Sequence, residues 1–198
     1  MELLPAVGNL DEDAELEIVC ITGCNSIGIF DLSQPAMVKT NAFINSGKLL
    51  TSPVIGDLDQ DGTNEIIILG NGTDDDVQGG IHVFNILGEE LPGFPALVDE
   101  HFDSSPALAD LDGDGDLEII AASHRSNLIH AIHHHGFPLD GWPVGRVRDG
   151  LLRATPLVAD VDGDRKLDIL LPTYGSTFSL IQGGDRTRTS GLRAWDNE

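Results

Sequence analysis

Basic residues are scarce in this chain of 198 residues: 11 Lys and Arg stand against 33 Asp and Glu, which leaves a formal net charge of −22. Nucleic-acid binding depends on Lys and Arg contacts to phosphates, so the composition argues against a nucleic-acid partner. Two cysteines are too few for a disulfide framework. No apolar run approaches the roughly 20 residues of a membrane-spanning helix, and helical periodicity is not sustained anywhere. We expect an all-β chain with no membrane span in this segment.

Sequence motifs of common enzyme classes are also missing. The chain has no nucleophile elbow, zinc-protease helix, phosphate loop or dinucleotide fingerprint. We therefore expect no catalytic residues, no organic cofactor site and no enzyme activity within this segment.

One pattern occurs four times: a lead-in of proline and small apolar residues, an acidic loop with a polar or acidic side chain at every second position, and a short apolar run. The loops begin at Asn9, Asp57, Asp110 and Asp160, at spacings of 48, 53 and 50 residues. A period of about 50 residues indicates a solenoid, a propeller or an array. A second landmark, residues 91–95 (LPGFP), recurs 48 residues later as LDGWP, which places both at the ends of their units.

The apolar runs are short, rich in Ile, Leu and Val, and bounded by turn residues, as in β-strands. In the third unit the predicted strands are Pro106–Asp110, Leu117–Ser123, Asn127–His133 and a fourth near Trp142–Arg146. The second of these contains an unbroken apolar run, which indicates a strand covered on both faces. Four antiparallel strands per unit with covered inner strands predict β-propeller blades.

We expect residues 1–198 to form one β-propeller segment of about four blades. The predicted blades are residues 1–46, 47–99, 100–149 and 150–198, the last incomplete. Residues 190–198 resemble a third strand that runs into its turn, with nothing left to supply a fourth. We therefore expect an open arc that further blades or self-association would complete, with Phe94 and Trp142 packed between adjacent blades.

The acidic loops predict metal sites. Calcium takes six to eight oxygen ligands at about 2.3–2.6 Å, and a tight loop can aim side chains one, three and five at one centre. Position seven adds a backbone carbonyl and position nine a closing carboxylate. The candidate ligands are Asn9, Asp11, Asp13, Glu15 and Glu17; Asp57, Asp59, Asp61, Thr63 and Glu65; Asp110, Asp112, Asp114, Asp116 and Glu118; and Asp160, Asp162, Asp164, Lys166 and Asp168.

The loops differ in how well they match this pattern. The second and third have glycine at position six, Gly62 and Gly115, whereas the fourth has Arg165 there and the first has Ala14. The first loop also begins with Asn9. We expect up to four Ca²⁺ ions, with loops two and three binding most strongly and loop one most weakly. An EF-hand is a poor fit, because it needs a bidentate Glu at position twelve, where the second and third loops have Ile68 and Ala121.

The pattern Asp-x-Asp-x-Asp-Gly-x-x-Glu before a β-strand, preceded by Ser/Thr-Pro and small apolar residues, resembles the FG-GAP/VCBS repeats of integrin-α-like β-propellers. The resemblance covers almost the whole chain. It implies a calcium-binding loop between the first two strands of each blade, a secreted or cell-surface setting, and a role in adhesion or recognition. The same repeats also occur as accessory or catalytic propellers of larger secreted proteins, including some polysaccharide lyases.

Two functions remain open at this point. The preferred one is a calcium-stabilised extracellular, cell-surface or periplasmic module for binding or adhesion, with a protein or carbohydrate ligand at the cell surface. The alternative is the propeller part of a secreted carbohydrate-active enzyme whose catalytic residues lie elsewhere. A cluster of histidines, His130 and 133–135, is either a transition-metal site or a solvated turn, and we favour the turn.

Overall fold

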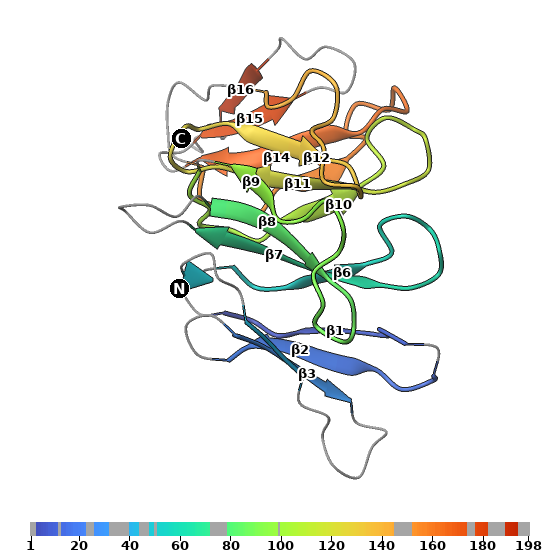
Figure 1. Ribbon diagram of the computed structural model, residues 1–198. Helices are drawn as coiled ribbons and strands as arrows, with labels where there is room; N and C mark the ends of the chain where they lie inside the picture. The colour runs from blue at the N-terminus through green and yellow to red at the C-terminus, as the bar shows by residue number, and fades with distance from the viewer. Residues whose placement is uncertain are drawn as a thin grey trace, which may run out of the picture.

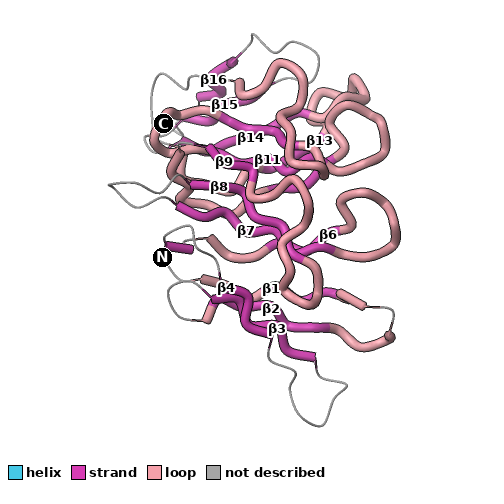
Figure 2. The backbone as a smooth tube through the Cα atoms, in the orientation of Figure 1, coloured by secondary structure: helices cyan, strands magenta, loops and turns pink. Residues whose placement is uncertain are grey.

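The structure, a computed structural model, consists of antiparallel β-strands joined by loops (Figures 1 and 2). It describes residues 3–11, 13–22, 26–31, 40–43, 48–49, 51–71, 79–98, 100–144, 152–173, 177–181 and 189–193. Within these ranges, no helix long and apolar enough to cross a membrane is found. The regular elements of the described residues are all β-strands, which confirms the prediction of an all-β chain.

Each copy of the sequence repeat forms its own sheet. The first sheet has the order β1 (Ala6–Gly8), β2 (Glu17–Ile21), β3 (Ser26–Asp31) and β4 (Thr40–Phe43). In the second sheet, β5 (Lys48–Leu49) and β6 (Val54–Gly56) both pair with β7 (Glu65–Asn71), which is followed by β8 (Gly79–Phe84) and β9 (Ala96–Val98). The third sheet has the order β10 (Ala107–Ala109), β11 (Glu118–Ala122) and β12 (Ile129–Ile132). The fourth has β13 (Leu157–Ala159), β14 (Asp168–Thr173), β15 (Thr177–Ile181) and β16 (Thr189–Arg193).

The third unit shows how closely the sequence predicts strands. Its first three strands lie within the predicted ranges and are shorter by one or two residues at each end. The predicted fourth strand is reduced to a bridge in which Ile129 and Val144 exchange two backbone hydrogen bonds of 3.0 and 2.9 Å. The Trp142 N–H, which would make the next bond of the ladder, donates instead to the Leu139 carbonyl at 2.9 Å. Residues 145–150 lie outside the described part of the chain.

The fourth sheet corrects one prediction. Residues 190–198 do not begin a third strand: Thr189–Arg193 is β16, the fourth strand, and it pairs along its length with β15. The third strand is Thr177–Ile181, in which polar and apolar residues alternate. This alternation, which ends at Ile181, is a weaker signal than the unbroken apolar runs of β7 and β11. Residues 194–198 are outside the described ranges.

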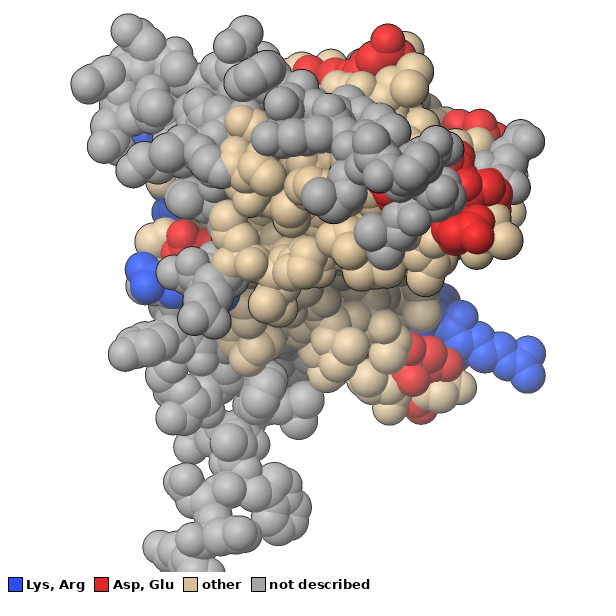
Figure 3. All heavy atoms as spheres, turned by 90° about the horizontal axis from the view of Figure 1, so that it is seen from below, with Lys and Arg blue, Asp and Glu red and all other residues tan. Residues whose placement is uncertain are grey.

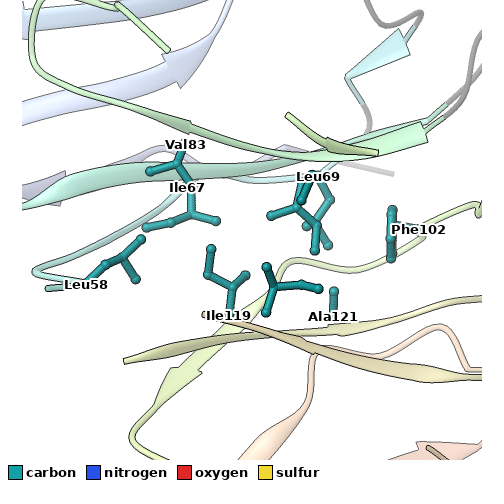
Figure 4. Packing of buried hydrophobic residues seen from close by; sticks show 10 residues of the cluster. Leu58, Ile67, Leu69, Val83, Phe102, Ile119 and Ala121 are labelled. Atoms are coloured by element: carbon teal, nitrogen blue, oxygen red, sulfur yellow. The ribbon is translucent and has the colours of Figure 1, made fainter. Parts of the chain in front are cut away.

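The sheets pack face to face, and the inner strands are buried on both sides. On β7, Ile66 and Ile68 join a core cluster with residues of the first sheet, whereas Ile67 and Leu69 join a cluster with Ile119 of the third (Figure 4). Successive side chains of a strand point to opposite faces. This double burial explains why the run Ile66–Leu69 has no polar alternation, as the sequence predicted.

The aromatic residues of the two end-of-unit landmarks lie where they were predicted. Phe94 packs against the cluster between the second and third sheets. Trp142 packs against a cluster that includes Ile120 of the third sheet and Ile169 of the fourth. Both are therefore packing residues between neighbouring sheets.

The first strands of neighbouring sheets lie side by side: β1 contacts β6, and β10 contacts β13. Small residues make this approach possible. A Cβ atom at Gly8 would lie 2.9 Å from Cγ2 of Ile55, and one at Gly56 would lie 2.5 Å from Cδ1 of Leu108. No core cluster of the described residues joins the first sheet to the fourth, so the sheets form an open stack (Figure 1).

Packing between the sheets should dominate stability. We expect Ile119→Ala, which empties a fully buried position between the second and third sheets, to lower the free energy of unfolding by about 2–5 kcal/mol. The measurement is urea unfolding followed by circular dichroism. The control is Leu87→Ala at a side chain that is 64% exposed, where a change of under about 0.5 kcal/mol is expected. Equal losses in both variants would contradict the face-to-face packing.

Candidate metal-binding loops

Each acidic loop joins two consecutive strands, β1 to β2, β6 to β7, β10 to β11 and β13 to β14, and their antiparallel pairing closes it. The residue before position one pairs with position nine in every copy: Gly8 with Glu17, Gly56 with Glu65, Ala109 with Glu118 and Ala159 with Asp168. The loops β1–β2 and β6–β7 protrude on the same side of the stack (Figure 1). Asp and Glu atoms gather mainly along one side of the face shown in Figure 3.

Side-chain oxygens at positions one, three and five curl the loops. In the third loop, Asp112 Oδ1 accepts the backbone N–H of Asp114 at 3.2 Å, and Asp114 Oδ1 accepts that of Asp116 at 3.0 Å. The same two-residue step occurs at positions three and five of the first, second and fourth loops. Such Asx turns fold the backbone around the side chains. They bring alternate carboxylates to the concave side of the loop.

Position nine is a buried carboxylate in all four copies. Glu17, Glu65, Glu118 and Asp168 are 0%, 7%, 0% and 1% exposed. In each copy one oxygen accepts the backbone N–H of position two, at 2.6, 2.9, 2.7 and 3.0 Å in chain order. The shorter Asp168 makes the same contact as the three glutamates. The repeated hydrogen bond fixes each carboxylate at the base of its loop.

Burial makes the three position-nine glutamates costly to ionise. Desolvation raises the pKa of Glu65 to about 7, with further contributions from the charges of Asp59, Asp61 and Asp57, while the Leu58 N–H opposes the rise. Desolvation also raises the pKa of Glu17 and of Glu118, and the nearby His133 opposes the rise at Glu118. A cation bound in the loop would remove this cost, because it stabilises the charged form.

The structure brings most of the predicted side chains together. Ligand atoms lie within 4.8 Å of one another in five groups, which are Asp11, Asp13 and Asp31; Asp57, Asp59 and Asp61; Asp110, Asp112 and Glu118; Asp112, Asp114 and His133; and Asp160, Asp162 and Asp168. Glu17, Glu65 and Asp164 are not part of these groups. The predicted position-seven carbonyls, of Glu15, Thr63, Asp116 and Lys166, stay predictions.

Two buried oxygens fit a bound cation. Glu17 Oε1 and Asp57 Oδ1 are shielded from solvent and have no hydrogen-bond partner. A buried polar atom without a partner costs about 1–3 kcal/mol, and a metal ion would satisfy it. The donor atoms in the first, second and fourth loops are all oxygens, which is the set that calcium prefers.

At position six, the glycines adopt the left-handed backbone conformation, and Arg165 adopts it as well. Gly62 and Gly115 have positive φ angles of 93° and 108°, and Arg165 also has a positive φ, of 70°. The Arg165 N–H donates to Asp160 Oδ2 at 2.9 Å, as the Gly62 N–H donates to Asp57 Oδ2 at 3.0 Å. The fourth loop thus keeps the turn without glycine, at the cost of a conformation that side chains disfavour.

Sequence reasoning missed Asp31, and it assigned His133 to a solvated turn in preference to a transition-metal site without connecting it to the acidic loop. Asp31 is the last residue of β3 and His133 directly follows β12. Their carboxylate and imidazole reach the loops only because the third strand pairs with the second. Strand register could have identified both residues. Each lies at or directly after the end of a short strand that pairs with the apolar strand beginning at position nine.

A second group of buried polar side chains lies near the opposite end of β11. Glu100 is 8% exposed and accepts hydrogen bonds from the Ser123 and Ser126 hydroxyls. The imidazole Nε2 of His130 lies 3.7 Å from Glu100 Oε1 and has no hydrogen-bond partner. Because both hydroxyls donate to the carboxylate, neither is paired with the imidazole as a nucleophile would be with a base. The group ties the connector before β10 to the third sheet.

No protein-family model matches the sequence, and no curated protein matches it either. Two solved structures are similar in fold. The biofilm matrix protein Bap1 of V. cholerae matches 94% of this chain with a TM-score of 0.61 and 18% identity, and a protein of unknown function from Bacteroides caccae matches 91% with a TM-score of 0.50 and 12% identity. The chain spans 27% and 57% of the lengths of these two proteins.

The raised pKa of Glu65 predicts the pH dependence of the calcium-free protein. Below the usual pKa of 4.5 both the folded and the unfolded state hold this proton. Between 4.5 and about 7 only the folded state holds it. The stability that this proton contributes is therefore fully present at low pH and is lost as the pH rises through this window. We expect the melting temperature to be higher at pH 5 than at pH 8.

Glu65→Gln tests the origin of this effect, because an amide oxygen can still accept the Leu58 N–H. We expect the variant to melt higher than the wild type at pH 8 without calcium and to show a smaller pH dependence in differential scanning calorimetry. The control is Glu89→Gln, at an exposed carboxylate. Identical pH dependence in Glu65→Gln and the wild type would contradict the assignment.

Proposed function

We propose that this chain is a calcium-stabilised β-propeller segment of the FG-GAP/VCBS type that serves as an extracellular binding or adhesion module. The observation that carries the proposal is the buried position-nine carboxylate, which occurs in all four loops with the same hydrogen bond to position two. The face-to-face sheets and neighbouring first strands support the assignment of the sheets as blades.

Electrostatics give the calcium a structural role. The loops contain 15 candidate ligand carboxylates, and four divalent ions would change the formal net charge from −22 to −14. Without cations these carboxylates repel one another within each loop, which destabilises the compact state. Ions that bind only the folded state add stability by mass action. The loops are therefore sites where calcium supports folding.

An extracellular setting suits sites of this kind. Extracellular calcium-binding modules have dissociation constants of about 10⁻⁴–10⁻³ M, so partly exposed loops are saturated outside the cell. The similarity in fold to Bap1, a biofilm matrix protein, is compatible with this setting. Exposed loops at the edges of a rigid β scaffold are common binding surfaces, and we propose a protein or carbohydrate ligand for them.

Calcium removal tests the proposal. If two sites are each saturated at about 100 times their dissociation constant, binding adds about 5 kcal/mol. For a chain of this size that corresponds to about 10–20 °C in melting temperature. We expect EDTA to lower the melting temperature by this amount, and Ca²⁺ to restore it better than Mg²⁺, which demands a tighter octahedral site.

The matched control is the Asp59→Asn, Asp112→Asn double variant, which removes one carboxylate from each of the two loops expected to bind most strongly. Its response to calcium should be clearly smaller than that of the wild type. A melting curve of the wild type that EDTA does not move would overturn the calcium proposal. Release of new reducing ends from an acidic polysaccharide would favour the alternative of a carbohydrate-active enzyme.

A further inference from the structure

The residue across from position nine on the third strand of a sheet faces the acidic loop. Glu17 on β2 pairs directly with Asp31 on β3. In the third sheet Ile119 pairs with Ile132, so the next residue, His133, lies across from Glu118. His133 Nδ1 is 3.0 Å from Glu118 Oε1. The same register position thus offers a carboxylate to the first loop and an imidazole to the third.

Both side chains come within reach of the loop ligands. An oxygen of Asp31 lies within 4.8 Å of oxygens of Asp11 and Asp13, and a ring nitrogen of His133 lies within 4.8 Å of oxygens of Asp112 and Asp114. These partners are positions three and five in both loops. The agreement between two separate units argues that the register position belongs to the site.

A buried oxygen in the first loop gives independent support. Glu17 is 0% exposed and its Oε2 accepts the Leu10 N–H at 2.6 Å, but Oε1 has no hydrogen-bond partner. The charges that act on this carboxylate are those of Asp11, Asp13 and Asp31. An ion held between these groups would satisfy the oxygen and neutralise the repulsion.

We propose that in the first and third units the residue across from position nine is an additional metal ligand and determines the cation of its loop: Asp31 makes the first loop a calcium site, and His133 makes the third loop a zinc site. This proposal rests on the proposed function, because it uses the same acidic loops. It gives the first loop stronger calcium binding than the sequence-based order does, and it assigns zinc instead of calcium to the third loop.

Ligand chemistry explains the difference. Calcium is a hard cation that takes oxygen ligands, whereas imidazole nitrogen suits Zn²⁺ and other borderline transition ions. Asp112, Asp114 and His133 supply three of the four groups of a zinc coordination shell. His133 binds as the neutral ring, through the ring nitrogen that approaches Asp112 and Asp114.

The second loop is an internal reference, because Asn85 occupies the equivalent position, next to Phe84, which pairs with Ile66. Asn85 Oδ1 accepts the Glu89 N–H at 2.9 Å, and its Nδ2 donates to Glu89 Oε2 at 3.1 Å. This side chain is engaged in its own turn. The second loop therefore binds through loop residues alone.

Zinc titration by isothermal calorimetry, on the full chain in calcium-containing buffer, tests the third loop. Loss of groups that merely orient a ligand weakens metal binding about 10–100-fold, so His133→Asn should weaken Zn²⁺ binding at least about tenfold while leaving calcium affinity within about twofold. The control is His135→Asn, which removes an exposed imidazole from the same turn and should leave zinc affinity unchanged. Equal losses in the two variants would overturn the site in favour of nonspecific binding by the histidine run.

Crystallography of the wild type gives a test that does not depend on the folding of a variant. Anomalous difference maps from crystals grown with both ions should show Zn²⁺ at the third loop and Ca²⁺ at the first, with Asp31 and His133 in the coordination shells. Zinc missing from the third loop, or an ion in the first loop that Asp31 does not contact, would overturn the proposal. Failure of the calcium function itself would look different, because Ca²⁺ would then be missing from the second loop as well.

Discussion

The hydrogen bond from the backbone of position two to the carboxylate of position nine is the constraint on which the loops depend. It joins the first turn of the loop to the first residue of the second strand. At Leu10 and Leu58 the same residue that donates the N–H also buries its side chain in the core, with 1% and 2% exposure. Loop closure and sheet packing are therefore coupled through one residue. The fourth loop couples them less tightly, because Val161 is 48% exposed.

The four loops share a backbone design but differ in the donors they present. Arg165 adopts the left-handed conformation that glycine adopts in the second and third loops, and its backbone hydrogen bond to Asp160 helps to offset the strain. The first loop has Asn9 instead of an acidic first ligand, but it gains Asp31 from the neighbouring strand. The copies therefore differ in their candidate ligands, while the Asx turns and the hydrogen bond from position two to position nine are kept.

The sequence predicts the features that depend on local spacing. Alternate carboxylates and unbroken apolar runs are visible in the chain, because loop curvature and double burial act on consecutive residues. Contacts across a hairpin are not visible in this way. Asp31 follows Glu17 by 14 residues, and His133 follows Glu118 by 15, while Asn85 follows Glu65 by 20. No fixed interval identifies this position, because turn lengths differ between the units.

The position of the last strands was missed for a related reason. The segment Thr177–Ile181 alternates polar and apolar residues, and its partner Thr189–Arg193 is largely polar. β16 pairs with β15 alone and is the edge strand, whereas β15 also pairs with β14. A strand at the edge of a sheet does not need apolar residues on both faces, so composition alone identifies it poorly.

Successive side chains of β7 point to opposite faces of the second sheet, so this sheet contributes to two hydrophobic cores. Ile66 and Ile68 serve one side and Ile67 and Leu69 the other, and Ile119 and Ile120 of β11 are divided in the same way. Stability then behaves as a sum over nearest neighbours along the stack. Unfolding of a middle sheet would expose both adjoining cores, whereas a sheet at the end of the described stack exposes one. The stack should therefore fray from its ends inward and resist local opening at its centre.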